Sequence, residues 1–262
     1  MKQLYIRFKK KILSSWVFSI VDLLLINSEH QVAEAVRLGS DYGGWWVPEN
    51  LSDMNSKDSV FISAGVGEDI SFDLAMVSHF RLSGILIDPT QRSLSYIKST
   101  LGKYRNLKES PIIHTESDLL EFELNADDNL TLSFINKAVW KDNDGVMLIP
   151  PDNPDHVSYR LRGDGRGEQF DTVSLSDLLS EYKKVKLVKL DIEGSELEIL
   201  ATLVLENLER VDVLLVEFDF LRQPKVSDAL RFLQIARKLR ASGHFLLKRE
   251  GLNLTLVRRK IR

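Results

Sequence analysis

The stretch Val60-Phe61-Ile62-Ser63-Ala64-Gly65-Val66-Gly67-Glu68-Asp69 decides the fold of this chain. Its first half is short, apolar and β-branched, which is typical of a buried parallel strand. The two glycines allow a sharp turn and the close approach of a ligand, because neither carries a Cβ. Apolar residues then recur at helical spacing as far as Phe80, and a second apolar strand ends in Asp88. An acid there, about 20 residues past the glycines, is where a nucleotide-binding βαβ unit binds ribose hydroxyls.

The residues that follow the glycines favour one kind of ligand over another. Ile70 stands where the dinucleotide fingerprint requires a third glycine. Glu68 and Asp69 open the helix, and two carboxylates at a helix N-terminus repel a pyrophosphate. They suit a cofactor that has a positive charge and no phosphate, such as S-adenosylmethionine, which combines a sulfonium, an ammonium group and a ribose. A tight strand-to-helix turn without a ligand is the alternative interpretation.

Length and composition exclude several classes of protein. The chain has 262 residues, 44% of them hydrophobic and 28% charged, which are ordinary values for a globular protein with one core. The net charge of −3 predicts no general attraction to nucleic acid. Because the chain contains no cysteine, it has neither disulfides nor thiolate chemistry, and we expect a cytoplasmic location.

Residues 1–50 are expected to form an N-terminal extension. Basic residues precede the apolar run 12–21, which Asp22 ends before it is long enough to span a bilayer comfortably. We expect a packed or amphipathic helix, with peripheral membrane contact as the alternative. The loop Gly43-Gly44-Trp45-Trp46 that follows either caps the core or forms an aromatic wall for a substrate such as a sugar ring.

Residues 51–262 are expected to form one α/β domain with an insertion around 141–170. After the first βαβ unit we expect a third strand at 130–135 that runs on to Ala138-Val139-Trp140, and further buried strands at 186–190 and 211–216. A single helix is expected between these last two strands, with Leu197, Leu200, Val204 and Leu208 on its apolar face. Insertions into such folds usually carry specificity.

The end of the chain distinguishes between forms of this architecture. Two strands, at 244–248 and 252–257, are joined so tightly that they must be antiparallel. A mostly parallel seven-stranded sheet with a terminal antiparallel hairpin and helices on both faces is the Rossmann-like fold of class I methyltransferases. It differs from the dehydrogenase form of the fold.

The chain resembles the FkbM family of S-adenosylmethionine-dependent methyltransferases over roughly residues 43–258. The resemblance rests on Gly43-Gly44-Trp45 with Val47-Pro48, on 63–73, on Asp88-Pro89-Thr90, on the loop 153–158 and on Leu187-Val188-Lys189-Leu190-Asp191-Ile192-Glu193-Gly194-Ser195-Glu196. The last stretch is similar to the family's D-x-E-G-x-E signature and is the most specific. Two positions depart from the family: Ser63 stands where an acid is usual, and Asp219 where relatives often have His.

The resemblance implies O-methylation, usually of a sugar or polyketide hydroxyl, and we expect a small-molecule or glycan acceptor. The residues expected to bind the cofactor are Ser63, Ala64, Gly65, Val66, Gly67, Glu68, Asp88, Pro89, Val139 and Asp191. Because a sugar hydroxyl does not ionise at neutral pH, a base should assist, and Asp191, Glu193 and His156 are the candidates. The spacing of the acids does not predict a metal site.

Two other functions stay open at this point. A binding protein that has kept the methyltransferase fold and lost its activity is consistent with Ser63. A nicotinamide oxidoreductase is opposed by the missing third glycine, by the acidic helix start and by the terminal hairpin. Neither the acceptor nor the oligomeric state is indicated by any motif.

Overall fold

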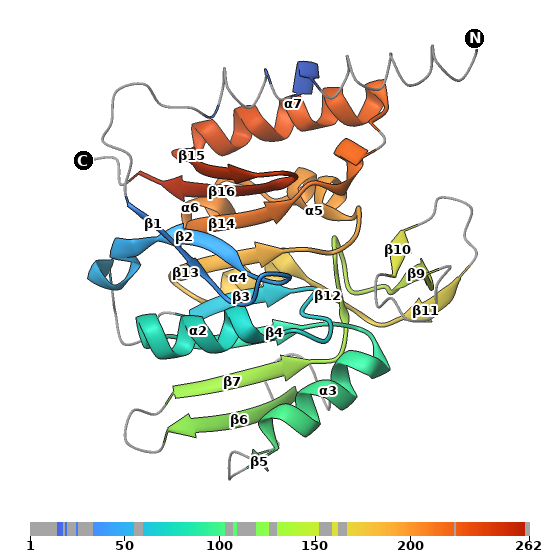
Figure 1. The fold of residues 1–262 in the computed structure, drawn as a ribbon. Coiled ribbons are helices and arrows are strands. Elements are labelled where there is room, and N and C mark those ends of the chain that lie inside the picture. The colour runs from blue at the N-terminus through green and yellow to red at the C-terminus, as the bar shows by residue number, and fades with distance from the viewer. Residues whose placement is uncertain are drawn as a thin grey trace.

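A nine-stranded mixed sheet forms the centre of the computed structural model (Figure 1). The structure describes residues 15–17, 19, 25, 34–54, 60–102, 107–108, 119–125, 130–151, 159–161, 167–222 and 224–259. The strand order is β15-β16-β14-β13-β3-β4-β7-β6-β5. The strands are β3 (Val60–Ala64), β4 (Ser83–Ile87), β5 (Leu107–Lys108), β6 (Leu119–Asn125), β7 (Leu130–Ile135), β13 (Val185–Leu190), β14 (Val211–Glu217), β15 (His244–Glu250) and β16 (Asn253–Arg258).

Five neighbouring strands, β14, β13, β3, β4 and β7, are parallel to one another. Strand β16 pairs antiparallel with both β14 and β15. The sheet has nine strands rather than the seven expected, because β6 and β5 extend it antiparallel beyond β7. These two strands lie in a polar part of the sequence where no strand was predicted.

Helices cover the two faces of the sheet because side chains alternate along each buried strand. Along β3, Phe61 belongs to a core cluster shared with Phe72 and Met76 of α2 (Ser71–Phe80) and with α3 (Gln91–Leu101). Its neighbour Ile62 belongs to a second cluster on the opposite face, shared with Phe232. That face is covered by α4 (Leu175–Glu181), α5 (Glu196–Thr202), α6 (Leu205–Glu209) and α7 (Val226–Ala241).

We expected one helix between β13 and β14, but the chain forms two short helices there. One residue of the expected apolar face was also placed incorrectly. Helix α5 ends at Thr202, the backbone of Leu203 is extended, and α6 begins after Val204. Val204, placed on the buried stripe by its spacing, is 59% exposed, whereas Leu197, Leu200 and Leu208 are buried. The break lets each short helix turn its own apolar side toward the sheet.

The segment Ala138-Val139-Trp140 was also predicted incorrectly. It does not continue β7, which ends at Ile135. It forms a separate strand, β8 (Ala138–Trp140), which pairs in parallel with β12 (Thr172–Ser174) in a two-stranded sheet. The chain therefore leaves the main sheet after Ile135, and β8 and β12 frame the start and end of the inserted region.

The inserted region contains a small antiparallel sheet with the order β10-β9-β11. Its strands are β9 (Val146–Ile149), β10 (Arg160–Leu161) and β11 (Glu168–Phe170). Figure 1 shows this sheet beyond the carboxyl ends of the parallel strands. A cluster of its own, with Val146, Leu148, Tyr159 and Phe170, holds it together.

The N-terminal part contributes to the core where it is described. Val17 and Leu25 are fully buried in the cluster that contains α7. A second pair of strands, β1 (Ala35–Leu38) and β2 (Trp45–Pro48), is antiparallel and precedes two short 3-10 turns, 49–54. Among the helices that the structure describes, none is both long and apolar enough to cross a membrane.

Candidate active site

One register row across the parallel strands creates the candidate site. The parallel ladders between β4, β3, β13 and β14 end with Ile87, Ala64, Leu190 and Val216, which lie side by side. The next residues along the four strands are therefore neighbours as well, and they are Asp88, Gly65, Asp191 and Glu217. The chain leaves β3 toward β4 on one side and returns through β13 on the other, which makes this edge a topological switch point.

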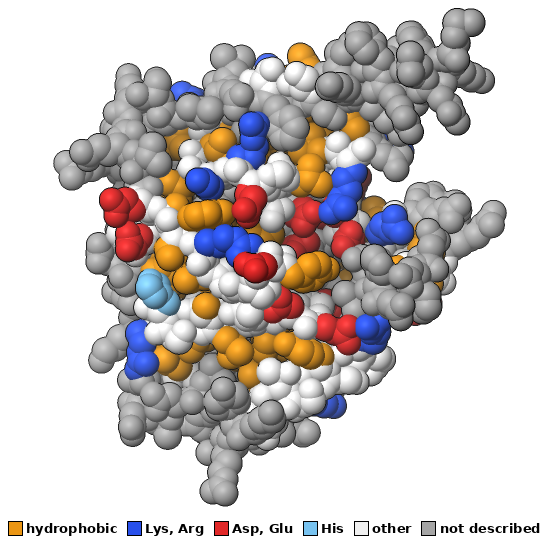
Figure 2. Space-filling view, in the orientation of Figure 1, with side chains coloured by type: hydrophobic (Ala, Val, Ile, Leu, Met, Phe, Trp, Pro, Cys, Tyr) orange, Lys and Arg blue, Asp and Glu red, His pale blue; other side chains and the backbone are white. Residues whose placement is uncertain are grey.

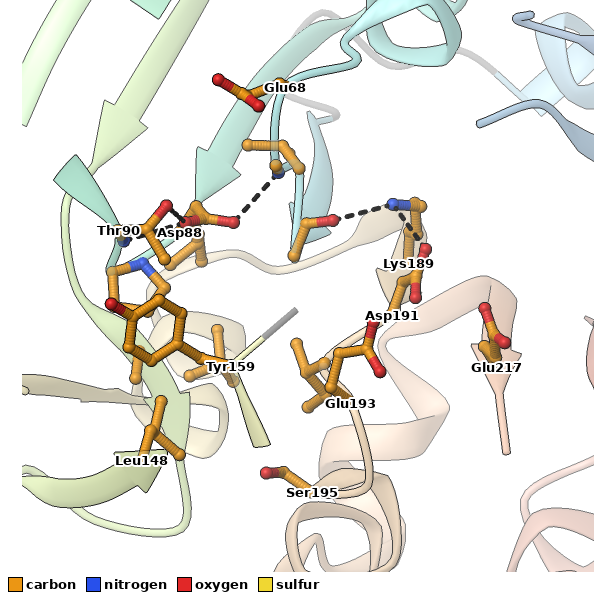
Figure 3. Close-up of a pocket in the computed structure, with 18 of the residues that line it drawn as sticks. Glu68, Asp88, Thr90, Leu148, Tyr159, Lys189, Asp191, Glu193, Ser195 and Glu217 are labelled. Atoms are coloured by element: carbon orange, nitrogen blue, oxygen red, sulfur yellow. Dashed lines mark hydrogen bonds and ion pairs between the residues drawn. The ribbon is translucent and has the colours of Figure 1, made fainter. Parts of the chain in front are cut away.

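A cavity of about 900 Å³ opens at this edge. Its walls come from the ends of β3, β4, β13 and β14, from the loop before β2, from β8 and from the inserted sheet. Figure 2 shows acidic side chains gathered around the carboxyl ends of the strands. In Figure 3, Asp88 and Thr90 lie at one end of the cavity beside Tyr159, whereas Asp191, Glu193 and Glu217 lie toward the other. The volume is that of a site for a cofactor and a small molecule.

Asp88 holds the glycine loop in place. Its Oδ2 accepts a hydrogen bond from the backbone N–H of Gly67 at 3.0 Å. Its Oδ1 accepts from the backbone N–H of Thr90 at 2.9 Å and from the Thr90 hydroxyl at 2.7 Å. Burial raises the pKa of Asp88, although these hydrogen bonds oppose the shift. One acceptor position on Oδ2 stays available for a ligand, since a carboxylate has about four lone-pair sites.

The two glycines of the loop adopt backbone conformations that L-residues with side chains rarely adopt. Gly65 has φ 77° and Gly67 has φ 53°. The N–H of Gly65 donates to the carbonyl of Ile87 at 2.9 Å, which joins the loop to β4. The loop therefore owes its shape to glycine at both positions.

Lys189 lies beneath the loop and was missed by the sequence reasoning. Its ammonium group is 3.3 Å from the carbonyl oxygen of Gly65 and 3.4 Å from Asp191 Oδ2. It also lies 5.8 Å from the centre of the Trp45 ring. Because the residue is almost fully buried, its charge also acts on the buried carboxyl of Asp73 and opposes the rise that burial causes in the pKa of that group.

The turn after β13 carries the D-x-E-G-x-E residues. Glu193 has φ 53° and Gly194 has φ 97°, so two successive residues are in left-handed conformations. Glu196 folds back under the turn, where its Oε1 accepts from the N–H groups of Ile192 at 3.3 Å and Gly194 at 3.0 Å. Burial raises the pKa of Glu196 to about 8. The turn thus points Asp191 and Glu193 into the cavity, while Glu196 supports it from inside the protein.

A second group of carboxylates lies at the end of β14 and directly after it. Arg222 binds Glu217 Oε1 through Nη2 at 2.6 Å and lies 2.5 Å from Asp219 Oδ1 through Nε. Burial, with the neighbouring charges of Asp191 and Asp219, raises the pKa of Glu217 to about 7. Burial and the charge of Glu193 raise the pKa of Asp219 to about 6. Within the described part of the chain, no group of acids and histidines has the arrangement of a metal site.

The loop ahead of β2 closes the cavity near the start of α2. Asp69 Oδ2 accepts from the Ser40 hydroxyl at 2.5 Å, and its Oδ1 accepts from the backbone N–H of Ser71 at 2.9 Å. Although partial burial raises the pKa of Asp69, these hydrogen bonds and the charge of Lys189 leave it lowered. Tyr42 and Gly43 line the cavity, whereas Trp45 is buried in the core. Of the two interpretations of this loop, capping of the core is therefore the one that applies to Trp45.

The structure brings most of the predicted residues together around one cavity. These are Gly65, Val66, Gly67, Glu68, Asp88, Pro89, Val139, Asp191 and Glu193. Ser63 and Ala64 are fully buried and do not line it, since both precede Gly65, where the chain leaves β3. His156 lies outside the described residues.

Other lining residues had no signal strong enough to single them out in the sequence. Tyr159 lies on the inserted sheet, where its ring packs edge-on against Phe170 and its hydroxyl bonds Glu168. Lys189 and Glu217 lie in or at the end of apolar strands, and Arg222 lies in a short 3-10 helix, η2 (Asp219–Arg222). A charged residue inside a buried strand is the one clue that was present, because such residues are almost never fully buried unless they are paired.

A cavity at the switch point of a mostly parallel sheet, with a glycine loop at one end and strand-end acids at the other, is the arrangement in which α/β enzymes bind nucleotide-like cofactors. A model of the methyltransferase FkbM domain matches residues 43–243, so the chain belongs to the FkbM methyltransferase family. The resemblance found in the sequence is thereby confirmed, and the family supports methyltransferase activity.

Two further comparisons add little. No curated protein matches the chain. Among solved structures, the antibiotic-resistance methyltransferase Kmr is similar at 15% sequence identity, over 86% of this chain and 100% of that one, with a TM-score of 0.32. A likeness this remote supports no conclusion about function.

Proposed function

We propose that this protein transfers a methyl group from S-adenosylmethionine to a hydroxyl of a sugar, a glycan or another small polar acceptor. The observation that carries the proposal is the charge of the cavity wall. Six lining residues are acids, namely Glu68, Asp69, Asp88, Asp191, Glu193 and Glu217, whereas two are basic, Lys189 and Arg222. Both basic residues are already paired with carboxylates. Such a wall attracts a cationic ligand and repels a phosphate.

The residues present fit S-adenosylmethionine, which supplies an electrophilic methyl group on a sulfonium when bound. Asp88 Oδ2 has an acceptor position for a ribose hydroxyl. Pro89, Val139 and Tyr159 line the same cavity as Asp88 and offer apolar and aromatic surface for a purine. The backbone at Gly65 and Gly67 leaves room for the rest of the molecule. A dinucleotide would bring its pyrophosphate to the acidic side of the loop.

Hydroxyl methylation agrees with the groups at the other end of the cavity. A sugar hydroxyl keeps its proton at neutral pH, so a base that receives this proton lowers the barrier. Asp191, Glu193 and Glu217 line the same cavity as the glycine loop, and this supports the proposal that an acceptor hydroxyl finds a carboxylate close to the methyl group. Holding the acceptor oxygen in line with the bond that breaks supplies much of the remaining rate.

Calorimetry with S-adenosylhomocysteine and with NADH tests the cofactor, and transfer of labelled methyl from S-adenosylmethionine to fractionated glycan extract tests the reaction. We expect S-adenosylhomocysteine to bind, NADH not to bind, and label to enter a carbohydrate fraction in alkali-stable form. Binding of S-adenosylhomocysteine without transfer to any fraction would favour an inactive binding protein. Binding of NADH alone would favour an oxidoreductase.

A further inference from the structure

The row of strand ends brings two carboxylates together that are 26 positions apart in the sequence. Leu190 and Val216 are paired in the parallel ladder of β13 and β14, so Asp191 and Glu217 are the next pair in register. Neighbouring strands are about 4.8 Å apart, and residues opposite each other in a parallel pair point to the same side. Both side chains line the cavity.

The two carboxylates differ in what holds them. Asp191 Oδ2 forms an ion pair with the buried ammonium of Lys189 at 3.4 Å. Within the described part of the chain, Glu217 is held on one oxygen, where Arg222 Nη2 donates to Oε1 at 2.6 Å. No hydrogen bond from another described residue reaches Glu217 Oε2. Glu217 therefore has an oriented carboxylate with one oxygen available to the cavity.

We propose that Glu217 is the catalytic base, which accepts the proton of the acceptor hydroxyl on Oε2, with Asp191 as its anionic neighbour and Arg222 as a positioning residue. This assignment rests on the proposed function. The acceptor oxygen forms its bond to the methyl carbon while the carbon–sulfur bond breaks and its electron pair stays on sulfur. The hydroxyl proton passes to Glu217 and then to solvent, which restores the carboxylate.

The charges around Glu217 suit this role. Asp191 acts on Glu217 from the turn after β13, and Asp219 acts on it from η2. Glu193 acts on Asp219. Arg222 and, through Asp191, Lys189 supply positive charge. The negative neighbours and burial prevail, so the pKa of Glu217 rises to about 7, near the pH at which a base is most effective. Among the described residues, no arginine or lysine side chain holds Glu193 in the way that Arg222 holds Glu217. Asp191 is paired with Lys189.

The assignment is tested with Glu217→Gln, which keeps size and shape, and with Glu209→Gln as a control on an exposed helical acid. We expect Glu217→Gln to bind S-adenosylhomocysteine within about 3-fold of wild type and to lower kcat of methyl transfer to the glycan fraction by about 10²–10⁴-fold, with little change in KM. The control should match wild type. Transfer by Glu217→Gln within a few-fold of wild type would overturn the assignment.

A second measurement needs no acceptor. In protein with carbon-13-labelled glutamate, the Glu217 carboxyl signal is identified by its absence in Glu217→Gln. We expect it to titrate near pH 7 in wild type and at lower pH in Asp191→Asn, because the anionic neighbour is gone. An ordinary midpoint in both proteins would contradict the pairing. If wild-type protein binds no S-adenosylhomocysteine or methylates nothing, the proposed function itself fails, which is a different result from transfer that survives in Glu217→Gln.

Discussion

The backbone carbonyl of Asp191 occupies the space that a side chain at Gly65 would need. A Cβ built on Gly65 would overlap that oxygen and crowd the Ile192 side chain. Gly65 thus lets β3 and β13 end side by side with their turns in contact. A sequence reading assigns both glycines of the loop to ligand approach, yet at Gly65 the nearest obstacle is the neighbouring turn of the protein.

Gly65→Ala is therefore expected to destabilise the fold rather than only block a ligand. The cost combines a left-handed alanine, about 1–2 kcal/mol, with displacement of the Asp191 turn, for a total of about 3 kcal/mol or more. Urea denaturation measures it. Gly251→Ala is the matched control, because Gly251 has φ 60° and nothing lies near its Cβ position, so it carries the backbone cost alone. An equal loss of unfolding free energy in the two variants would show that the Asp191 turn moves aside at little cost.

Asp88→Ala should weaken S-adenosylhomocysteine binding by about 10- to 100-fold and also lower stability. The buried N–H group of Thr90 and the partly buried N–H group of Gly67 would lose their acceptor, and such losses cost up to about 1–3 kcal/mol each. Calorimetry and urea denaturation measure the two effects separately. Thr90→Ser keeps the hydroxyl that binds Asp88 and should resemble wild type. Unchanged affinity in folded Asp88→Ala would remove Asp88 from the cofactor site.

Lys189→Met should move the pH dependence of methyl transfer to higher pH by about one unit. Burial raises the pKa of Asp73 and of Asp88, and the charge of Lys189 opposes both shifts, so without this cation the two carboxylates hold their protons to higher pH. The readout is the midpoint of the kcat–pH profile. Lys141→Met, at an exposed lysine, is the control. A lower kcat at every pH with an unchanged midpoint would mean that Lys189 only supports the fold.

Glu196→Gln should change how stability depends on pH. The pKa of Glu196 is raised from its ordinary value to about 8 in the folded state, so between these values the folded protein binds a proton that the unfolded chain has lost. The stability contribution of this group is complete below about pH 4.5 and is lost as pH rises toward 8, with a slope of up to about 1.4 kcal/mol per pH unit.

Urea denaturation at a series of pH values measures this slope. Relative to wild type, Glu196→Gln should lose less stability between pH 5 and 8, because glutamine does not titrate and keeps an oxygen for the N–H groups of Ile192 and Gly194. Glu198→Gln, two residues along the same helix and partly exposed, should keep the wild-type slope. Parallel curves for all three proteins would show that Glu196 titrates normally.

The sequence by itself determined the features that depend on local periodicity and on backbone geometry. Val60 to Ala64 and Val185 to Leu190 are strands because short β-branched and apolar runs bury both faces, and Gly65 and Gly67 mark the loop because the chain turns with positive φ there. The acids Asp88 and Asp191 could be placed at the carboxyl edge of the sheet for the same reason. The family motif pointed to the same residues.

Only the tertiary structure decided which of these strand ends meet. The register of β13 with β14 places Glu217 beside Asp191, and the same ladder buries Ser63 one layer below the cavity. Lys189 meets Gly65 across 124 positions of sequence, and Ala138–Trp140 leaves the main sheet to pair with Thr172–Ser174. Hydrogen-bond pairing between distant segments fixes these neighbours, and the periodicity within one segment does not indicate which other segment it pairs with.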